Sequence, residues 1–199
     1  MIDSLTIRNL LDAATITTIV AEMRSSHAAA ATVYGETKHG GTVNPRVRKV
    51  SRLAVSLEIR ERVKELLMQQ KEQLAQRFGV ALTYCEDPQF LRYETGDFFV
   101  AHQDGNTPII YDHTRFRKVS VSIYLSQRAA EPTPDTYGGG ELVLYSRSSD
   151  ARQLIAETPG TLVAFRSETT HEVLPITHGE RYTIVSWFRS DELKVQLSP

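Results

Sequence analysis

The sequence has a single cysteine, no long apolar run and almost no net charge. With only Cys85, no intramolecular disulfide can form, which agrees with a reducing compartment. No stretch approaches the roughly 18 consecutive apolar residues of a membrane span, and residues 1–26 lack the unbroken apolar core of a signal peptide. A formal net charge of -1 argues against affinity drawn from nucleic-acid phosphates. We therefore expect a cytoplasmic protein with no membrane association, and nucleic acid is not an expected partner.

The length and composition of the chain fit one globular domain, spanning residues 1–199. The chain is 41% hydrophobic and 24% charged, which is enough for one well-filled core and little for two. Residues 10–26 and 56–79 carry apolar residues at helical spacing. The stretch between them indicates a long loop, with a short strand expected at 31–34. We expect residues 1–79 to form a helical support region.

The pattern changes after Gly79. Short runs such as "VSVSIYL" and "YTIVSWF" alternate small or polar residues with apolar ones, and turns separate them. There are about eight such runs, and strands do not alternate with helices, which argues against a doubly wound sheet. We expect a mainly β protein with N-terminal helices. Residues 80–190 would form a double-stranded β-helix, or jelly roll, flanked by helices.

One motif in the β region has the composition of a metal site. In "FFVAHQDGNTP", His102 and Asp104 are two residues apart, which directs both side chains to one side of a strand. Taken alone, the motif is more typical of a polar turn that follows a strand. A metal site needs a third ligand, and the other histidines are the candidates: His27, His39, His113, His171 and His178.

His171 is the best placed of these candidates, because it opens a predicted late strand, "HEVLPIT". A His-X-Asp motif with a distant histidine is the 2-His-1-carboxylate pattern, which leaves coordination positions open and is associated with non-haem Fe(II) oxygenases. Structural zinc sites are usually closed by four ligands, commonly including cysteine, and Cys85 offers no such set. The pattern predicts a metal site formed by His102, Asp104 and His171.

Arg181 begins an apolar strand ten residues after His171. An unpaired guanidinium is costly to bury, so this side chain requires a carboxylate, which its planar fork can hold through two parallel hydrogen bonds. Either the protein or a ligand can supply that carboxylate. For such an arginine taken alone, a structural salt bridge is the commoner outcome.

From about Gln89 to Arg189, the sequence resembles the Fe(II)- and 2-oxoglutarate-dependent dioxygenases, specifically the prolyl 4-hydroxylase-like branch. The matching segments follow the order of the family: "LRYETGDFFVAHQD", "VSVSIYLS", "YGGGELVLY", "TPGTLVAF" and "HEVLPITHGERYTIVSWF". A His-X-Asp motif alone is weakly specific, whereas this ordered set, with its spacing from His171 to Arg181, is strongly specific. The first half of the chain matches only in general character, as helices that support the β core.

The resemblance assigns roles to individual residues. It implies that His102, Asp104 and His171 bind Fe(II), and that Arg181 pairs with the distal carboxylate of 2-oxoglutarate. The cosubstrates would be 2-oxoglutarate and O2, with ascorbate as a candidate reductant. The products from 2-oxoglutarate would be succinate and CO2.

The resemblance also concerns the walls of the cosubstrate pocket. It places Tyr124 near the same carboxylate and Tyr93 among the aromatic residues of the pocket. Two positions depart from some relatives: Phe99 replaces a tyrosine and Val185 replaces a threonine. Thr183 is a candidate to restore the hydrogen bond that a valine at position 185 cannot make.

The substrate is the least determined part of the prediction. Hydroxylation of an unactivated C–H bond in a prolyl residue of a peptide or protein is favoured, and a free amino acid or another small metabolite is the alternative. Oxidative demethylation of nucleic acid is disfavoured by the near-neutral charge. A non-catalytic jelly-roll binding module is the rival from outside the enzymes. Candidate substrate contacts lie in two predicted loops: Arg46, Arg48 and Asn106.

Overall fold

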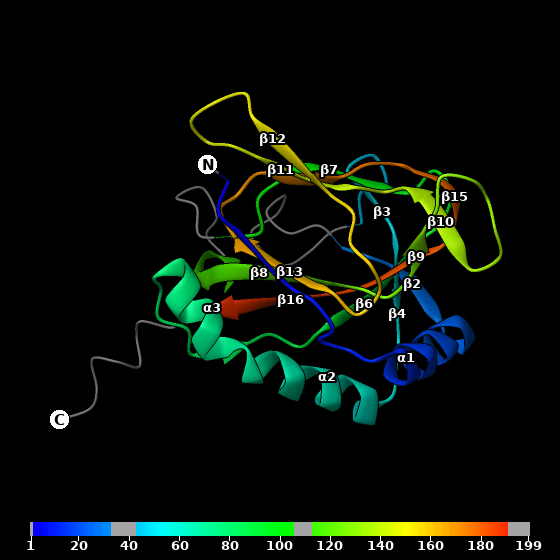
Figure 1. Cartoon of the computed structure of the whole chain (residues 1–199), viewed down its shortest axis with the longest axis horizontal. Helices are drawn as coiled ribbons and strands as arrows, with labels where there is room; N and C mark the ends of the chain where they lie inside the picture. The colour runs from blue at the N-terminus through cyan, green and yellow to red at the C-terminus, as the bar shows by residue number, and fades with distance from the viewer. Residues whose placement is uncertain (1, 33–42, 106–112, 191–199) are drawn as a thin grey trace.

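The computed structural model describes residues 2–32, 43–105 and 113–190, and within them the fold is mainly β with three α-helices (Figure 1). The helices are α1 (Ala13–Ser25), α2 (Leu57–Gln69) and α3 (Lys71–Phe78). A short 3-10 helix, η1, spans His113–Phe116. α1 begins at Asp12, whose carboxylate accepts a hydrogen bond of 2.7 Å from the Thr15 backbone N–H. None of these helices has the length and hydropathy to cross a membrane.

The helix predicted over residues 56–79 is two helices. The backbone at Gln70 (φ -86°, ψ -7°) leaves the regular helical path, and its N–H bonds to the carbonyl of Leu67 in a tight 3-10 manner, which separates α2 from α3. Leu57 is apolar and was expected to lie on the buried side of this helix, but it is 57% exposed because it is the first residue of α2. Gly79 ends α3 at φ 60°, as expected of a left-handed cap.

An eight-stranded sheet forms the middle layer of the described structure. Its order is β1-β13-β8-β16-β6-β4-β2, and β5 pairs with β16 outside this path. The strands are β1 (Ser4–Ile7), β13 (Leu162–Arg166), β8 (Arg117–Tyr124), β16 (Arg181–Arg189), β6 (Gln89–Tyr93), β4 (Ser51–Leu53), β2 (Ala28–Ala30) and β5 (Tyr84–Cys85).

Two smaller sheets complete the β structure in the described residues. The first has the order β12-β11-β14-β7-β3, and the second has the order β15-β10-β9. The strands of the first are β12 (Arg152–Ile155), β11 (Leu142–Tyr145), β14 (His171–Val173), β7 (Phe98–His102) and β3 (Arg48–Lys49). The strands of the second are β15 (Ile176–Gly179), β10 (Thr136–Gly139) and β9 (Gln127–Arg128).

The large sheet has an apolar core on each side. One core joins it to the helices and includes Met23 from α1, Leu67 from α2 and Ile184 from β16. The other core joins it to the five-stranded sheet and includes Phe165 from β13 and Leu144 from β11. Figure 1 shows the resulting layers, with the helices below the large sheet and β7, β11 and β12 above it.

The first 79 residues contribute strands as well as helices. β1, β2 and β4 extend the large sheet, and β3 pairs with β7. The strand expected at 31–34 is wrong for residues 31 and 32, which lie in no strand, while residues 33 and 34 lie outside the described residues. The strand present in this region is β2, where residues 28–30 pair with β4. Backbone pairing therefore links the predicted support region to the β core, and the domain boundaries at 79 and 80 stay a prediction.

Candidate metal centre

Two neighbouring strands bring the distant metal-ligand candidates together. β7 and β14 pair antiparallel, and His102 lies directly opposite His171 in the register. The chain that follows β7 is fixed by the backbone N–H groups of Asp104 and Gly105, which both donate to the carbonyl of Ser167 at 2.9 and 3.2 Å. Strand pairing thus carries Asp104 to a point between the two imidazoles.

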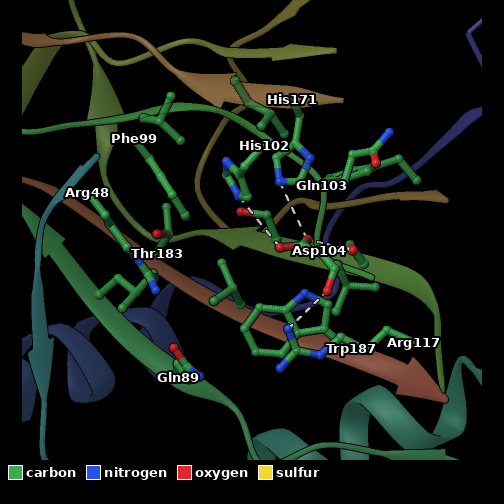
Figure 2. A pocket seen from close by; sticks show the side chains of 18 of the residues that line it. Arg48, Gln89, Phe99, His102, Gln103, Asp104, Arg117, His171, Thr183 and Trp187 are labelled. Carbon is green, nitrogen blue, oxygen red and sulfur yellow. Dashed lines mark hydrogen bonds and ion pairs between the residues drawn. The ribbon is translucent and has the colours of Figure 1, made fainter. Parts of the chain in front are cut away.

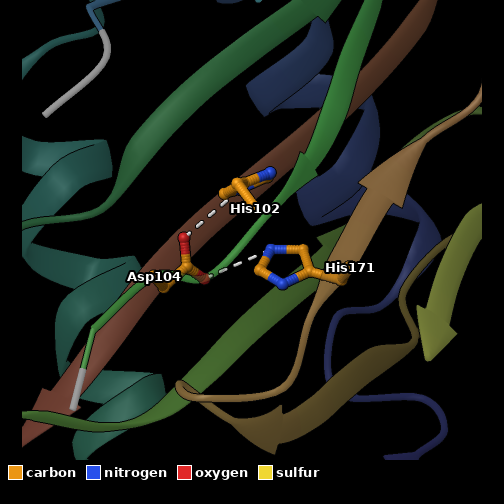
Figure 3. Close-up of side chains that lie close together, drawn as sticks. All are labelled: His102, Asp104 and His171. Carbon is orange, nitrogen blue, oxygen red and sulfur yellow. Dashed lines mark ion pairs between the residues drawn. The ribbon is translucent and has the colours of Figure 1, made fainter. Parts of the chain in front are cut away.

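The potential ligand atoms of His102, Asp104 and His171 all lie within 4.8 Å of one another (Figure 3). The His102 Nε2 atom is 3.6 Å from Asp104 Oδ1, and the His171 Nε2 atom is 3.4 Å from Asp104 Oδ2. Two imidazoles and one carboxylate on one side of a point are the ligand set of a facial triad. The predicted ligands are therefore brought together.

The outer nitrogens of both imidazoles have backbone partners. Nδ1 of His102 is 2.8 Å from the Val100 carbonyl, and Nδ1 of His171 is 2.9 Å from the Thr169 carbonyl. A carbonyl can only accept, so each Nδ1 carries a proton, and in a neutral ring each Nε2 then presents a lone pair to Asp104. Three acceptors that converge in this way fit a bound cation, and such orienting contacts are typical of metal-ligating histidines.

The protonation states also suit a metal. Burial favours the neutral form of Asp104, but the adjacent His171 and His102 outweigh it and hold the carboxyl pKa well below its usual range. Burial lowers the pKa of His171 to about 4. Ser120 Oγ donates to Asp104 Oδ2 at 2.7 Å. Near neutral pH, the site thus holds a carboxylate and a neutral imidazole, which are the metal-binding forms.

The triad opens into a pocket between the large sheet and the five-stranded sheet (Figure 2). Arg181 and Thr183, from the same face of β16, line this pocket and are 2% and 1% exposed. Arg181 Nε and Thr183 Oγ1 have no hydrogen-bond partner in the described chain, and no carboxylate there lies within 4.0 Å of Arg181. A buried guanidinium with no carboxylate partner in the described chain, beside a buried hydroxyl with no hydrogen-bond partner there, fits an acidic ligand such as 2-oxoglutarate.

Aromatic rings surround the Arg181 guanidinium. It lies 5.2 Å from the centre of the Tyr93 ring and 5.1 Å from the centre of the Tyr124 ring. Tyr93 lines the pocket, whereas Tyr124 packs beside Arg181 and is not among the lining residues. Burial raises the pKa of Tyr124 to about 12, so its hydroxyl keeps its proton and can donate.

Tyr137 on β10 is also buried, and its hydroxyl has no partner among the described residues. Tyr137 lies in a glycine-rich segment, and no pattern in the sequence indicated that this residue would lie near Arg181.

The two departures from relatives also line the pocket. The Phe99 ring stacks on the His102 ring, with centroids 3.5 Å apart and an interplanar angle of 17°. Val185 lies on the pocket face of β16, two residues beyond Thr183. Neither side chain can donate or accept a hydrogen bond, so both supply apolar wall.

The three candidate substrate contacts are placed differently. Arg48 lines the pocket, with its guanidinium 4.8 Å from the centre of the Phe99 ring. Arg46 is exposed and is not among the lining residues. Asn106 lies outside the described residues.

One charged cluster beside the triad was missed by sequence reasoning. Arg117 forms a two-pronged ion pair with Glu86, at 2.8 Å from Nε and 2.7 Å from Nη2, and lies over the Trp187 ring at 3.7 Å. Its Nη1 also donates to the backbone carbonyl of Asp104 at 3.3 Å. Figure 2 shows Arg117 and Trp187 together at the pocket. The period of two along β16 places Trp187 on the same face as Arg181, but no local pattern indicates Glu86.

Comparison with known proteins agrees with this geometry. The profile of the 2OG-Fe(II) oxygenase superfamily matches residues 88–189, slightly more than half of the chain. A PKHD-type hydroxylase of Shewanella sp. (strain MR-7) is 35% identical over 103 residues, which are 52% of this chain and 42% of the relative. A PKHD-type hydroxylase of Burkholderia ambifaria (strain MC40-6) is 33% identical over 104 residues, with the same coverage. The matched region thus spans less than half the length of these relatives.

Two solved structures share the fold over nearly the whole chain. A prolyl-4-hydroxylase of Pseudomonas putida superposes with a TM-score of 0.71 at 21% identity, covering 95% of this chain and 93% of that one. A prolyl hydroxylase of Trichoplax adhaerens also has a TM-score of 0.71, at 19% identity, covering 99% and 88%. The superfamily uses Fe(II), 2-oxoglutarate and O2, and the triad and Arg181 fit the first two. By its matched profile and its metal triad, the chain belongs to the 2OG-Fe(II) oxygenase superfamily.

Proposed function

We propose that this chain is an Fe(II)- and 2-oxoglutarate-dependent dioxygenase that hydroxylates a prolyl residue of a peptide or protein. The single observation that carries the proposal is the pocket that holds the metal triad together with Arg181 and Thr183, whose Nε and Oγ1 atoms have no hydrogen-bond partner among the described residues. The names of the relatives support the reaction class. A peptide substrate is supported by the Trichoplax adhaerens structure, which is a complex with a peptide fragment.

The proposed fold of the catalytic core is a double-stranded β-helix. Two mostly antiparallel sheets face each other across the pocket, and β8, β13 and β16 of one oppose β7, β11 and β14 of the other. Sheets that pack in this way exclude water from a central site and hold side chains from distant strands on a rigid frame. The metal ligands lie on the smaller sheet, and the residues proposed for 2-oxoglutarate lie on the larger one.

Each residue has a defined task in this proposal. His102, Asp104 and His171 hold Fe(II), and Arg181 with Thr183 holds the distal carboxylate of 2-oxoglutarate. Fe(II), 2-oxoglutarate and O2 together supply the oxidising chemistry, with succinate and CO2 as products. The chain itself orients the C–H bond and keeps water away from it. Tyr93 supplies the aromatic wall.

Product analysis tests this function. The protein would be incubated with Fe(II), 2-oxoglutarate and ascorbate, together with a panel of prolyl peptides and, separately, free amino acids. We expect succinate and a +16 Da peptide in the same samples, at a stoichiometry of about one to one. Product from free amino acids alone would favour the small-metabolite alternative. Absence of succinate with every substrate, in protein shown to bind Fe(II), would contradict the enzyme proposal and favour a binding module.

A further inference from the structure

Arg48 is a second buried arginine in the same pocket. It is 9% exposed and lies on β3, opposite Phe99 in the antiparallel register with β7. Its Nη1 donates to the Thr32 carbonyl at 2.8 Å, whereas its Nε is buried and has no partner among the described residues. No carboxylate of those residues lies within ion-pair distance of it. A guanidinium buried in this way needs an anion that the described chain does not supply.

The position of Arg48 separates it from the proposed 2-oxoglutarate contacts. Its guanidinium packs on the Phe99 ring, which in turn stacks on the ring of His102. Arg181 instead lies between Tyr93 and Tyr124 of the large sheet. In Figure 2, Arg48 and Phe99 line the pocket together, close to the metal triad. A ligand held by Arg48 would therefore lie beside the metal on the side of β3 and β7.

Among the described residues of the pocket, no charge compensates that of Arg48. Its described lining includes Arg48, Arg117, Arg181 and Asp104 as charged side chains, and the two histidines are counted in the neutral form that binds a metal. Arg117 is paired with Glu86, and the charges of Arg181 and Asp104 cancel in number. The two positive charges of Fe(II) and the two negative charges of ionised 2-oxoglutarate would also cancel. Among the described residues, one positive charge, that of Arg48, remains for the substrate.

We propose that Arg48 binds a carboxylate of the substrate, so that the enzyme selects substrates with a negative charge beside the hydroxylated residue. This inference rests on the proposed function and specifies the class of its substrate. The Arg48 Nε atom has no hydrogen-bond partner among the described residues. The planar set of N–H donors in a guanidinium matches the two oxygens of a carboxylate. The carboxylate can be the free C-terminus of a prolyl peptide, the α-carboxylate of free proline or the side chain of a neighbouring acidic residue.

Matched substrate pairs distinguish these sources without any change to the protein. The probes are acetyl-Ala-Pro as free acid and as amide, proline and prolinamide, and acetyl-Asp-Pro-amide with acetyl-Asn-Pro-amide. Affinity would be measured by calorimetry on protein loaded with Mn(II) and 2-oxoglutarate, and turnover by succinate release with Fe(II). We expect at least one charged probe to bind about 10- to 100-fold more tightly than its neutral partner, as hydrogen bonds to a charged group allow.

Variants at position 48 assign the preference to Arg48. In Arg48→Gln, the ratio of the affinities for the charged and the neutral probe should fall to about one. In Arg48→Lys this ratio should be intermediate, because the positive charge is kept but the planar pair of N–H donors is lost. Arg52→Gln is the control, because it removes an equal charge from an exposed position on β4, the next strand along the chain. A thermal shift on addition of Mn(II) and 2-oxoglutarate verifies that each variant is folded.

The outcomes separate this inference from the proposed function. Equal binding of every charged and neutral pair by the unaltered protein would overturn the role of Arg48, even if succinate forms. An Arg48→Gln variant that weakens charged and neutral probes equally would overturn it as well. Charge-selective binding without succinate would support the role of Arg48 and contradict the proposed reaction.

Discussion

The two faces of strand β16 have opposite characters, although both are buried. One face packs against the helices and carries Tyr182, Ile184 and Phe188. The other face lines the pocket and carries Arg181, Thr183, Val185 and Trp187. Because successive side chains of a strand point to opposite sides, one nine-residue segment serves a stabilising core and a reactive site.

The same division holds on the neighbouring strand β8. Val119 and Ile123 join the helical core, whereas Ser120 and Ser122 line the pocket and Ser120 supports the metal carboxylate. Polar groups buried without partners lower stability. The helix-facing side must therefore provide the stability that the pocket side lacks, and substitutions on the two faces should have different consequences.

The largest effect is expected for the pocket-side metal ligand His171. In His171→Ala the triad loses one of its three ligands, so metal binding should be lost and succinate formation should be abolished. Titration calorimetry with Mn(II) measures the loss directly. His27→Ala is the control, because His27 is exposed and should leave binding unchanged. Retained affinity in His171→Ala would show that another residue completes the site.

On the opposite face, Ile184→Ala should act on stability alone. Ile184 is 0% exposed in the helix-facing core, so the substitution should lower the free energy of unfolding by about 2–5 kcal/mol. Urea denaturation measures this, and 2-oxoglutarate affinity should be unchanged at low temperature. The adjacent pocket-side variant, Val185→Ala, should lower the free energy of unfolding by less, because Val185 is only partly buried. Equal losses for both variants would contradict the division between faces.

Arg181→Met should show the reverse pattern. The affinity for 2-oxoglutarate should fall about 10- to 100-fold, because the carboxylate loses its charged partner. The free energy of unfolding without 2-oxoglutarate should change by less than about 1 kcal/mol, because no ion pair of the described chain is broken. Arg117→Met is the contrast, since it breaks the buried ion pair with Glu86 and leaves that carboxylate only the longer contact with Arg189, at 4.0 Å, so it should destabilise by about 3 kcal/mol. Unaltered 2-oxoglutarate affinity in Arg181→Met would disprove the assignment.

The smallest effect concerns the thiol of Cys85, which lies at 0% exposure in the helix-facing core. Burial raises its pKa to about 11, so almost no thiolate exists near neutral pH. Iodoacetamide should therefore modify the native protein very slowly at pH 7.5, as followed by mass spectrometry. The destabilised Ile184→Ala variant should react faster through transient opening. Rapid modification of the native protein would show that this core is open to solvent.

Much of the fold and site could be predicted from local patterns. The change from helical spacing to alternation near Gly79 indicated a mainly β protein, and the His-X-Asp motif with His171 and Arg181 identified the triad and a buried cation. The break at Gln70 could not be predicted, because helical periodicity continues through it. β1 was also missed, since its pairing with β13 joins residues far apart in the chain.

Local sequence patterns alone identify the residue types that suit a metal and an acidic cosubstrate, because those types stand at fixed offsets within strands. Which of these side chains lack a partner among the described residues depends on the tertiary fold. No local sequence pattern distinguishes Arg117 from Arg48. In the structure, Arg117 forms an ion pair with Glu86, whereas Arg48 donates to a backbone carbonyl and packs on the Phe99 ring. Charge compensation depends on contacts between distant segments, and strand pairing across the sheets fixes those contacts.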